Sequence, residues 1–302
     1  MGTPNKILEA EKLVSEGEKH LQTGFFKWRA DFDSAAPCFE KAAITYRNFK
    51  QLDKACQLFL RVAECHYRND ARFHAAKAKE EAGNISLQMN NIQNACKYCD
   101  QASEVYLLEG TPDTAALCLK RLAQKIEMEH PQIAVEVYEK AAGVYENEDD
   151  TRFRPAAEIW GKMARLQVKM GKLTDALKSI AKEKKLYSQV EGGDHGASKR
   201  LVLAEVMIQL HLGDPVQAEQ TVYHCCEDVS GFDGSEEYQA LTELVEAYNN
   251  NNQADAARVL NTPLFKYMDT EYAKLSKKLT VPGGSSNPSN ESGNIEDDLD
   301  LL

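Results

Sequence analysis

Three short segments of the chain contain residue types that could do chemistry. Cys96 and Cys99 form a Cys-x-x-Cys pair, a spacing used by redox enzymes and by zinc sites. His224, Cys225 and Cys226 combine an imidazole with two thiols, and both groups are zinc ligands. The segment 192–196, Gly-Gly-Asp-His-Gly, superficially resembles a catalytic loop. Whether any of them is a site depends on the elements that carry it.

The surroundings of these segments favour packing over catalysis. The sequence has no second Cys-x-x-Cys, no glycine-rich phosphate loop, and no His-Glu-x-x-His or Gly-x-Ser-x-Gly motif. Cys99 and Cys225 occupy places in a helical repeat that aromatic residues or alanine fill elsewhere, and 192–196 falls between two repeats. We therefore predict no catalytic residue, no metal site and no cofactor, and we interpret the eight cysteines as reduced core thiols. An enzyme that uses Cys96 and Cys99 is the alternative, which thiol titration with a zinc assay would test.

The elements themselves follow from a repeat of about twenty residues. Small and large apolar residues recur at offsets of 4, 7 and 11, as in Ala35, Phe39, Ala42 and Tyr46. These offsets place side chains along one stripe of an α-helix, because about 3.6 residues make a turn. The frame begins again near residues 55, 75, 95, 115, 134, 156, 176, 197, 218 and 240. About 14–16 residues of helix and a tight turn fill each repeat, so successive helices must run antiparallel.

The repeat and its ends predict an all-α fold, a tetratricopeptide-like α-solenoid of antiparallel helix hairpins. Pro112, Pro131 and Pro215 each stand three residues before a frame alanine, in a first helical turn where a missing N–H costs little. We expect a first helix from about 6 to 22, and the frame weakens after about 235. The predicted domains are a helical repeat domain at 1–234, a C-terminal helical bundle segment at 235–280 and a disordered acidic tail at 281–302.

Composition excludes several classes of function. The net charge is −11, and a mildly acidic body argues against nucleic-acid binding, which needs a basic face. No apolar run approaches the roughly 18–20 residues that span a bilayer. The first residues do not resemble a secretion signal. We therefore expect a cytoplasmic protein that is recruited to membranes only peripherally.

Phe25, Phe26 and Trp28 place three large aromatic side chains within four residues, in an expected turn beside Lys27 and Arg29. Exposed apolar clusters mark contact surfaces. This aromatic loop (Phe25, Phe26 and Trp28) either folds back as a cap on the first helices or inserts into a membrane or a partner. At about 1.5–3 kcal/mol for each aromatic side chain, insertion would give weak and reversible membrane association.

The last six residues interleave acids with leucines on the expected tether, as Asp297, Asp298, Leu299, Asp300, Leu301 and Leu302. Acids alone would only keep a tail in solution. Acids with leucines favour a docking peptide, in which charge steers the encounter and leucine anchors the complex.

With the aromatic loop after the first helix, the helical frame from 35 to about 230 and the Asp/Leu terminus, the sequence resembles the soluble NSF attachment proteins, most closely the gamma type. The resemblance covers essentially the whole length. It implies an adaptor that is not an enzyme and serves membrane fusion in vesicle-mediated, ER–Golgi protein transport. In that family several copies coat the four-helix SNARE bundle, formed by syntaxin-type and partner SNAREs, and recruit the hexameric ATPase NSF.

The resemblance also implies roles for individual residues. The aromatic loop would contact the membrane, and 297–302 would engage the ATPase. Contact with the SNARE bundle would use basic residues of a concave face, here Arg154, Lys162, Lys199 and Arg200. Two features depart from the family pattern, since the loop is more basic and carries a tryptophan, and the chain ends in two leucines.

A generic tetratricopeptide-like scaffold or chaperone cofactor that binds a peptide partner is the alternative from another class. Such clamps need Lys, Arg and Asn clustered on the inner faces of consecutive repeats. The basic residues here are scattered along the sequence, which favours the adaptor.

Overall fold

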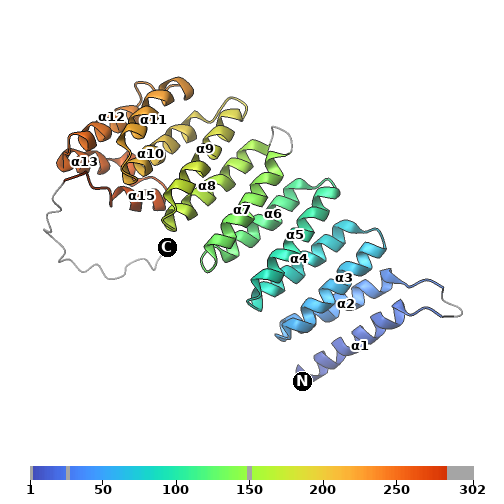
Figure 1. The fold of residues 1–302 in the computed structure, drawn as a ribbon. Helices are drawn as coiled ribbons and strands as arrows, with labels where there is room; N and C mark the ends of the chain where they lie inside the picture. The colour runs from blue at the N-terminus through green and yellow to red at the C-terminus, as the bar shows by residue number, and fades with distance from the viewer. Residues whose placement is uncertain (1–2, 25–27, 148–151, 284–302) are drawn as a thin grey trace. The chain divides into compact units, whose positions relative to one another are not determined.

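The computed structural model describes residues 3–24, 28–147 and 152–283. The regular elements in these ranges are all helices, which confirms the predicted all-α class. The chain divides into two compact units, 1–194 and 195–302. The first contains α1–α9 and the second contains α10–α15 (Figure 1).

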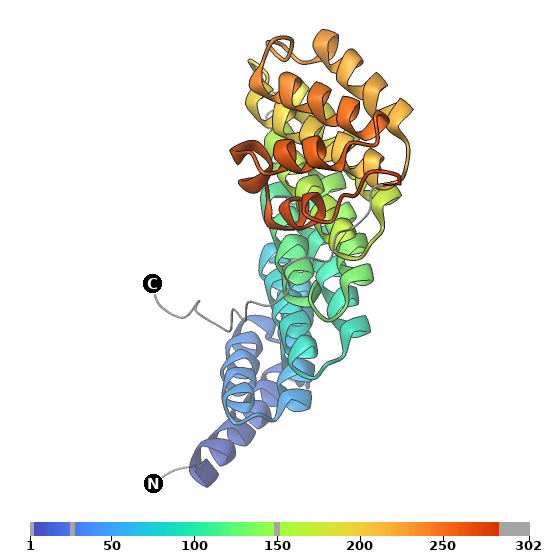
Figure 2. The same cartoon turned by 90° about the vertical axis from the view of Figure 1, so that its left-hand side faces the viewer.

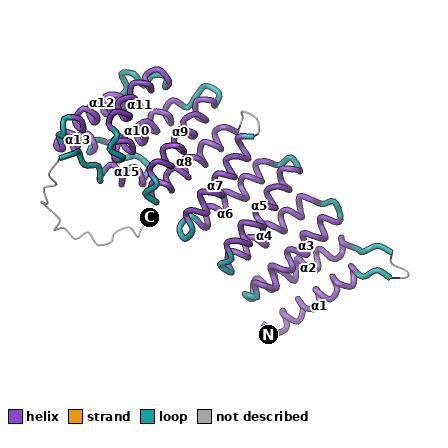
Figure 3. The backbone as a smooth tube through the Cα atoms, in the orientation of Figure 1, coloured by secondary structure: helices purple, strands orange, loops and turns teal. Residues whose placement is uncertain are grey.

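The first unit is a stack of helices in chain order, and each helix packs against the next one. Its elements are α1 (Thr3–Leu21), α2 (Phe32–Asn48), α3 (Leu52–Arg68), α4 (Arg72–Gln88), α5 (Ile92–Leu108), α6 (Pro112–Ile126), α7 (Pro131–Glu146), α8 (Phe153–Lys169) and α9 (Leu173–Gln189). Neighbouring helices run antiparallel, and the turns between them alternate between two edges of the stack (Figure 3). The predicted solenoid of helix hairpins is therefore confirmed.

Short turns set the period of the repeat. The helices α2 to α5 are each 17 residues long, slightly more than expected, because three residues suffice to connect them. The middle turn residue takes a left-handed conformation, with φ of 56° at Asp70 and 68° at Gly110. The next backbone N–H then bonds back into the last helical turn, as from Thr111 to the carbonyl oxygen of Tyr106 at 2.9 Å. This C-terminal cap satisfies carbonyls that the helix leaves unpaired.

The repeat frame forms the interior of the first unit. Ala35, Phe39 and Tyr106 are buried, as the spacing predicts. Small residues let neighbouring helices approach closely. A Cβ atom added to Gly83 of α4 would lie only 2.8 Å from Sγ of Cys99 on α5.

The second unit is a bundle around α10. Its elements are α10 (His195–His211), α11 (Pro215–Asp228), α12 (Glu236–Asn249), α13 (Gln253–Leu260), α14 (Pro263–Lys266) and α15 (Thr270–Ser276), shown from yellow to red in Figure 2. α10 packs against α11, α12 and α15 and buries residues on all sides. Ala197, a residue of the repeat frame in its first turn, is only half-buried. Nε2 of His211 lies 2.8 Å from the carbonyl oxygen of Leu275, which ties α10 to the end of α15.

The boundary between the compact units falls at 194/195. The weakening of the repeat frame predicts a division at 234/235 instead. The α10–α11 hairpin continues the frame but belongs to the second unit by its contacts, and the division at 234/235 stays a prediction. Val281, assigned to the tail from the sequence, is packed here. Its side chain is buried, and its backbone N–H donates to Oε1 of Gln253 at 2.9 Å.

Candidate functional site

The aromatic loop connects α1 to α2. Phe25 and Phe26 lie outside the described residues, while the side chain of Trp28 is 88% exposed. Asp31 closes the base of the loop, because its N–H donates to the carbonyl oxygen of His20 at 2.9 Å. The carboxylate of Asp31 also caps α2 by accepting from the N–H of Ser34 at 3.0 Å. The exposure of Trp28 favours a contact surface over a packed cap for this residue, and the role of the loop stays a prediction.

Other exposed apolar side chains lie along the same edge of the first unit. Since α1, α3 and α5 run parallel to one another, their C-terminal ends share the edge that carries the aromatic loop (Figure 1). Tyr67 near the end of α3 is 60% exposed, and Leu108 at the end of α5 is 78% exposed. The sequence analysis missed both, because a single apolar residue beside a turn is no cluster in the sequence. We call Trp28, Tyr67 and Leu108 the apolar edge.

The four basic residues expected to contact a partner fall in both units. Arg154 lies near the start of α8 and forms an ion pair with Asp194 at 2.8 Å. Its guanidinium carbon also lies 5.9 Å from the ring centroid of Tyr187. Lys199 is half-buried and Arg200 is exposed on α10 of the second unit. The structure thus places Arg154 and Lys162 on one helix and Lys199 and Arg200 on another.

Lys162 lies among charged side chains of both signs. It is half-buried on α8, and burial lowers the pKa of its ammonium group, as do the charges of Lys120 and Arg165. The carboxylates of Glu127 and Glu158 raise the pKa instead, and the effect of Glu127 is smaller than that of Lys120. A lysine in such surroundings gains free energy when an anionic group binds beside it. We call Lys120, Lys162 and Arg165 the α6–α8 basic cluster, which the sequence analysis did not identify.

The Cys-x-x-Cys pair sits in a packing environment. Cys99 is buried against Gly83, while Cys96 is half-buried. Burial raises the pKa of the Cys96 thiol, and Asp100 raises it further. A reactive thiol needs the opposite shift, because the thiolate is the nucleophile. The surroundings of this pair therefore fit packing rather than redox chemistry.

The other two candidate segments also have structural explanations. Cys225 is buried. Burial raises the pKa of the neighbouring Cys226 thiol, and the charge of Asp233 raises it further. In the segment 192–196, Gly192 and Gly193 have positive φ in a turn after α9, and His195 begins α10. Residues 192–194 therefore connect two helices, while 195 and 196 form the start of α10.

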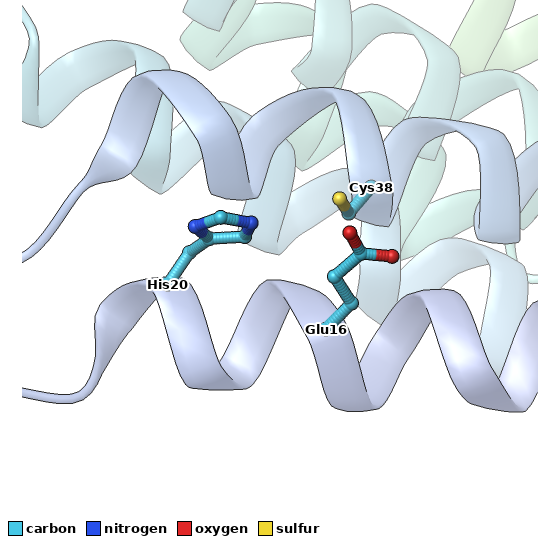
Figure 4. Close-up of side chains that lie close together, drawn as sticks. All are labelled: Glu16, His20 and Cys38. Atoms are coloured by element: carbon cyan, nitrogen blue, oxygen red, sulfur yellow. The ribbon is translucent and has the colours of Figure 1, made fainter.

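One group of metal-ligating side chains was not anticipated. Glu16 and His20 of α1 lie beside Cys38 of α2 (Figure 4). The sequence analysis missed it, because the thiol lies on a different helix from the other two side chains. The six residues expected to dock the ATPase, Asp297, Asp298, Leu299, Asp300, Leu301 and Leu302, lie outside the described residues.

No helix in the part of the chain that the structure describes is both long enough and apolar enough to span a bilayer.

Comparison with known proteins identifies relatives along most of the chain. The family model described as "Soluble NSF attachment protein, SNAP" matches residues 8–264. A gamma-soluble NSF attachment protein of Dictyostelium discoideum is 27% identical over 284 residues, which cover 94% of this chain and 86% of the relative. The protein of the same name from Arabidopsis thaliana is 23% identical over 96% of this chain and 98% of its own length. A probable vesicular-fusion protein, sec17 homolog, of Neurospora crassa is 26% identical over 80% of this chain and 76% of its own length.

Proposed function

The chain belongs to the soluble NSF attachment protein family, and we propose that it is an adaptor that binds SNARE bundles and recruits the ATPase NSF to take them apart. The observation that carries this proposal is the extent of the family match. It runs from α1 into α14 and so includes helices of both compact units. A scaffold that shared only a generic helical repeat with the family would not need the bundle around α10.

The α6–α8 basic cluster is the part of the first unit that best suits an acidic partner. The chain as a whole is acidic, with a net charge of −11, so an anionic partner needs a local positive surface to approach. Lys162 lies beside Lys120 and Arg165, although Glu127 and Glu158 offset part of their charge. Arg154 is a weaker candidate, because its guanidinium already pairs with Asp194 and stacks near Tyr187. Lys199 and Arg200 remain proposed contacts of the second unit.

The apolar edge suits a membrane surface. Tyr67 and Leu108 are exposed near the C-terminal ends of α3 and α5, and Trp28 is exposed in the loop that follows the parallel helix α1. In the turn next to Tyr67, Arg72 pairs with Asp70 at 3.0 Å and offsets the negative charge there. Each exposed apolar side chain contributes a few kcal/mol at most, so membrane association is weak and depends on several copies or a second tether.

The acidic C-terminus is proposed to dock NSF. Leucine supplies apolar area to bury, and aspartate supplies attraction toward a basic surface. The division of labour is thus a basic helix face for the SNARE bundle, an apolar edge for lipid and an acidic, leucine-containing terminus for the ATPase.

Binding and disassembly assays with purified components test the proposal. The full chain is mixed with an assembled SNARE bundle, NSF and ATP, and both bundle binding and the rate of disassembly are measured. The variant Lys120→Ala/Lys162→Ala should bind the bundle about tenfold more weakly, mainly through slower association, since two attractive charges are lost. The melting temperature of the variant is measured alongside, so that a loss of binding is separated from a loss of folding.

The matched control is Lys178→Ala/Lys185→Ala, which removes the same net charge from exposed positions of α9. The control should bind as the unchanged chain does. If the unchanged chain neither binds the bundle nor recruits NSF, the adaptor function is wrong. If it does both but the cluster variant matches the control, only the assignment of the basic cluster is wrong.

A further inference from the structure

Three side chains at the α1–α2 hairpin bring three kinds of metal-ligating atom together. Glu16 and His20 are four residues apart on α1, so they project from the same face of the helix. Cys38 faces them from α2 (Figure 4). A carboxylate oxygen, an imidazole nitrogen and the thiol sulfur of these residues all lie within 4.8 Å of one another.

The separations are close to those of a tetrahedral metal site. Bonds of about 2.0–2.3 Å at tetrahedral angles place zinc ligands roughly 3.4–3.7 Å apart. The three atoms therefore need to approach by at most about 1.4 Å, which side-chain rotation supplies. Glu16 is exposed and the other two side chains are half-buried, so an ion from solvent can reach the site.

A fourth residue provides the support that a metal-bound histidine usually has. Nδ1 of His20 lies 3.7 Å from Oδ2 of Asp31. In Figure 4 the other ring nitrogen of His20 is directed toward Glu16 and Cys38. A carboxylate beside the distal nitrogen fixes the ring orientation and makes the imidazole a better ligand. Asp31 is itself held in place, since its other carboxylate oxygen caps α2 at the N–H of Ser34.

We propose that Glu16, His20 and Cys38 bind a zinc ion, with Asp31 orienting the imidazole. One thiolate, one imidazole and one carboxylate form a donor set that suits Zn²⁺ and disfavours Mg²⁺ and Ca²⁺, which take oxygen ligands. When the cation binds, it displaces the proton of the Cys38 thiol, so zinc affinity falls at low pH. Water completes the coordination.

The ion would clamp the base of the aromatic loop. It joins the last turns of α1 to α2, on either side of the residues that carry Trp28. A fixed base lowers the entropy that the loop loses when it meets a surface. The inference concerns only the residues of the hairpin and does not depend on the proposed adaptor function.

Metal titration of the full chain tests the site. After treatment with a chelator, the chain is titrated with Zn²⁺ against a chromophoric competitor and separately with Co²⁺ as a spectroscopic probe. We expect one equivalent per chain with micromolar or tighter affinity. Bound Co²⁺ should give visible d–d bands of a tetrahedral site and a near-ultraviolet thiolate charge-transfer band.

Three variants test the site, and a fourth is the control. Cys38→Ser should abolish the charge-transfer band, and Glu16→Gln should weaken zinc binding by more than tenfold while preserving the exposed helix face. Asp31→Asn should weaken it by about tenfold, the usual effect of losing a carboxylate that orients a ligand. The control is Cys96→Ser, which removes another half-buried thiol and should change nothing.

The proposal fails if the unchanged chain binds no stoichiometric zinc. It also fails if Cys38→Ser and Glu16→Gln, shown by circular dichroism to be folded, bind zinc as tightly as the unchanged chain. Undiminished binding by these variants would place the metal elsewhere.

Discussion

Replacing Gly83 by alanine tests whether Cys99 is a packing residue. The added Cβ atom would lie 2.8 Å from Sγ of Cys99 and 3.3 Å from the carbonyl oxygen of Ala95. Non-bonded heavy atoms attract best at about 3.5–4.0 Å, so α4 and α5 must separate or the thiol must rotate within a filled interior. Overpacking of this kind costs about 1–3 kcal/mol. Alanine regains about 1 kcal/mol of helix propensity, so we expect a net loss of up to about 2 kcal/mol of unfolding free energy.

A double-mutant cycle separates the two contributions. In a Cys99→Ala background the conflicting sulfur is gone and only the contact with the carbonyl oxygen of Ala95 remains, so Gly83→Ala should destabilise the chain much less or not at all. The coupling between the two positions should therefore be about 1–3 kcal/mol, the range of the overpacking cost. Gly143 of α7 is the matched control, because a Cβ added there meets nothing within 4 Å. Gly143→Ala should raise the unfolding free energy by as much as about 1 kcal/mol.

Urea unfolding followed by circular dichroism measures all four variants, and their slopes with denaturant should stay alike. The reasoning is refuted if Gly83→Ala stabilises the chain as Gly143→Ala does, or if the cycle shows no coupling. Cys99 would then not be close-packed. The Cys96–Cys99 pair would again be open to interpretation as a redox or metal site.

Three further predictions concern pH, membrane and ATPase. Burial lowers the pKa of His211 in the folded chain, whereas in the unfolded chain the imidazole has its usual pKa of about 6.5. As the pH falls from about 7 to 5, the unfolded state therefore binds more protons and the unfolding free energy should fall. The fall should be smaller in His211→Gln. Serine at all three positions of the aromatic loop should reduce flotation with liposomes and leave the melting temperature nearly unchanged, whereas a drop of many degrees would identify a packed cap. Removing 284–302 should preserve SNARE binding and slow NSF-driven disassembly. The variant Leu301→Ala/Leu302→Ala should speed the dissociation of NSF. Disassembly at full rate by the truncated chain would make the tail a solubiliser only.

The core of this fold could be predicted from the sequence because its constraint is local. Phe39 and Ala42 repeat at helical offsets, and such offsets must face a neighbouring helix wherever they recur. The boundary between the compact units has no such local signal. The repeat frame continues through α10 and α11, so it does not mark the start of a second compact unit at His195.

The candidate sites were harder to predict, because exposed helix faces carry no periodic constraint. Tyr67 is an ordinary residue in the sequence, and only the parallel course of α1 and α3 places it on the same edge as Trp28. The cluster of Glu16, His20 and Cys38 likewise requires the α1–α2 packing to bring a thiol to the paired ligands of one helix.

A rule for finding such surface clusters follows from the repeat. Residues that meet on alternate helices of one layer are separated in the sequence by two helices and two turns. This separation is about forty positions. Lys140 of α7 reaches Asp100 of α5, 40 positions earlier, with Nζ at 2.5 Å from the carboxylate. The charges of Lys120 and Lys162 act on each other across 42 positions in the same way. Opposite charges at this spacing in the sequence therefore indicate ion pairs along the stack, and like charges at this spacing indicate places where local charge accumulates.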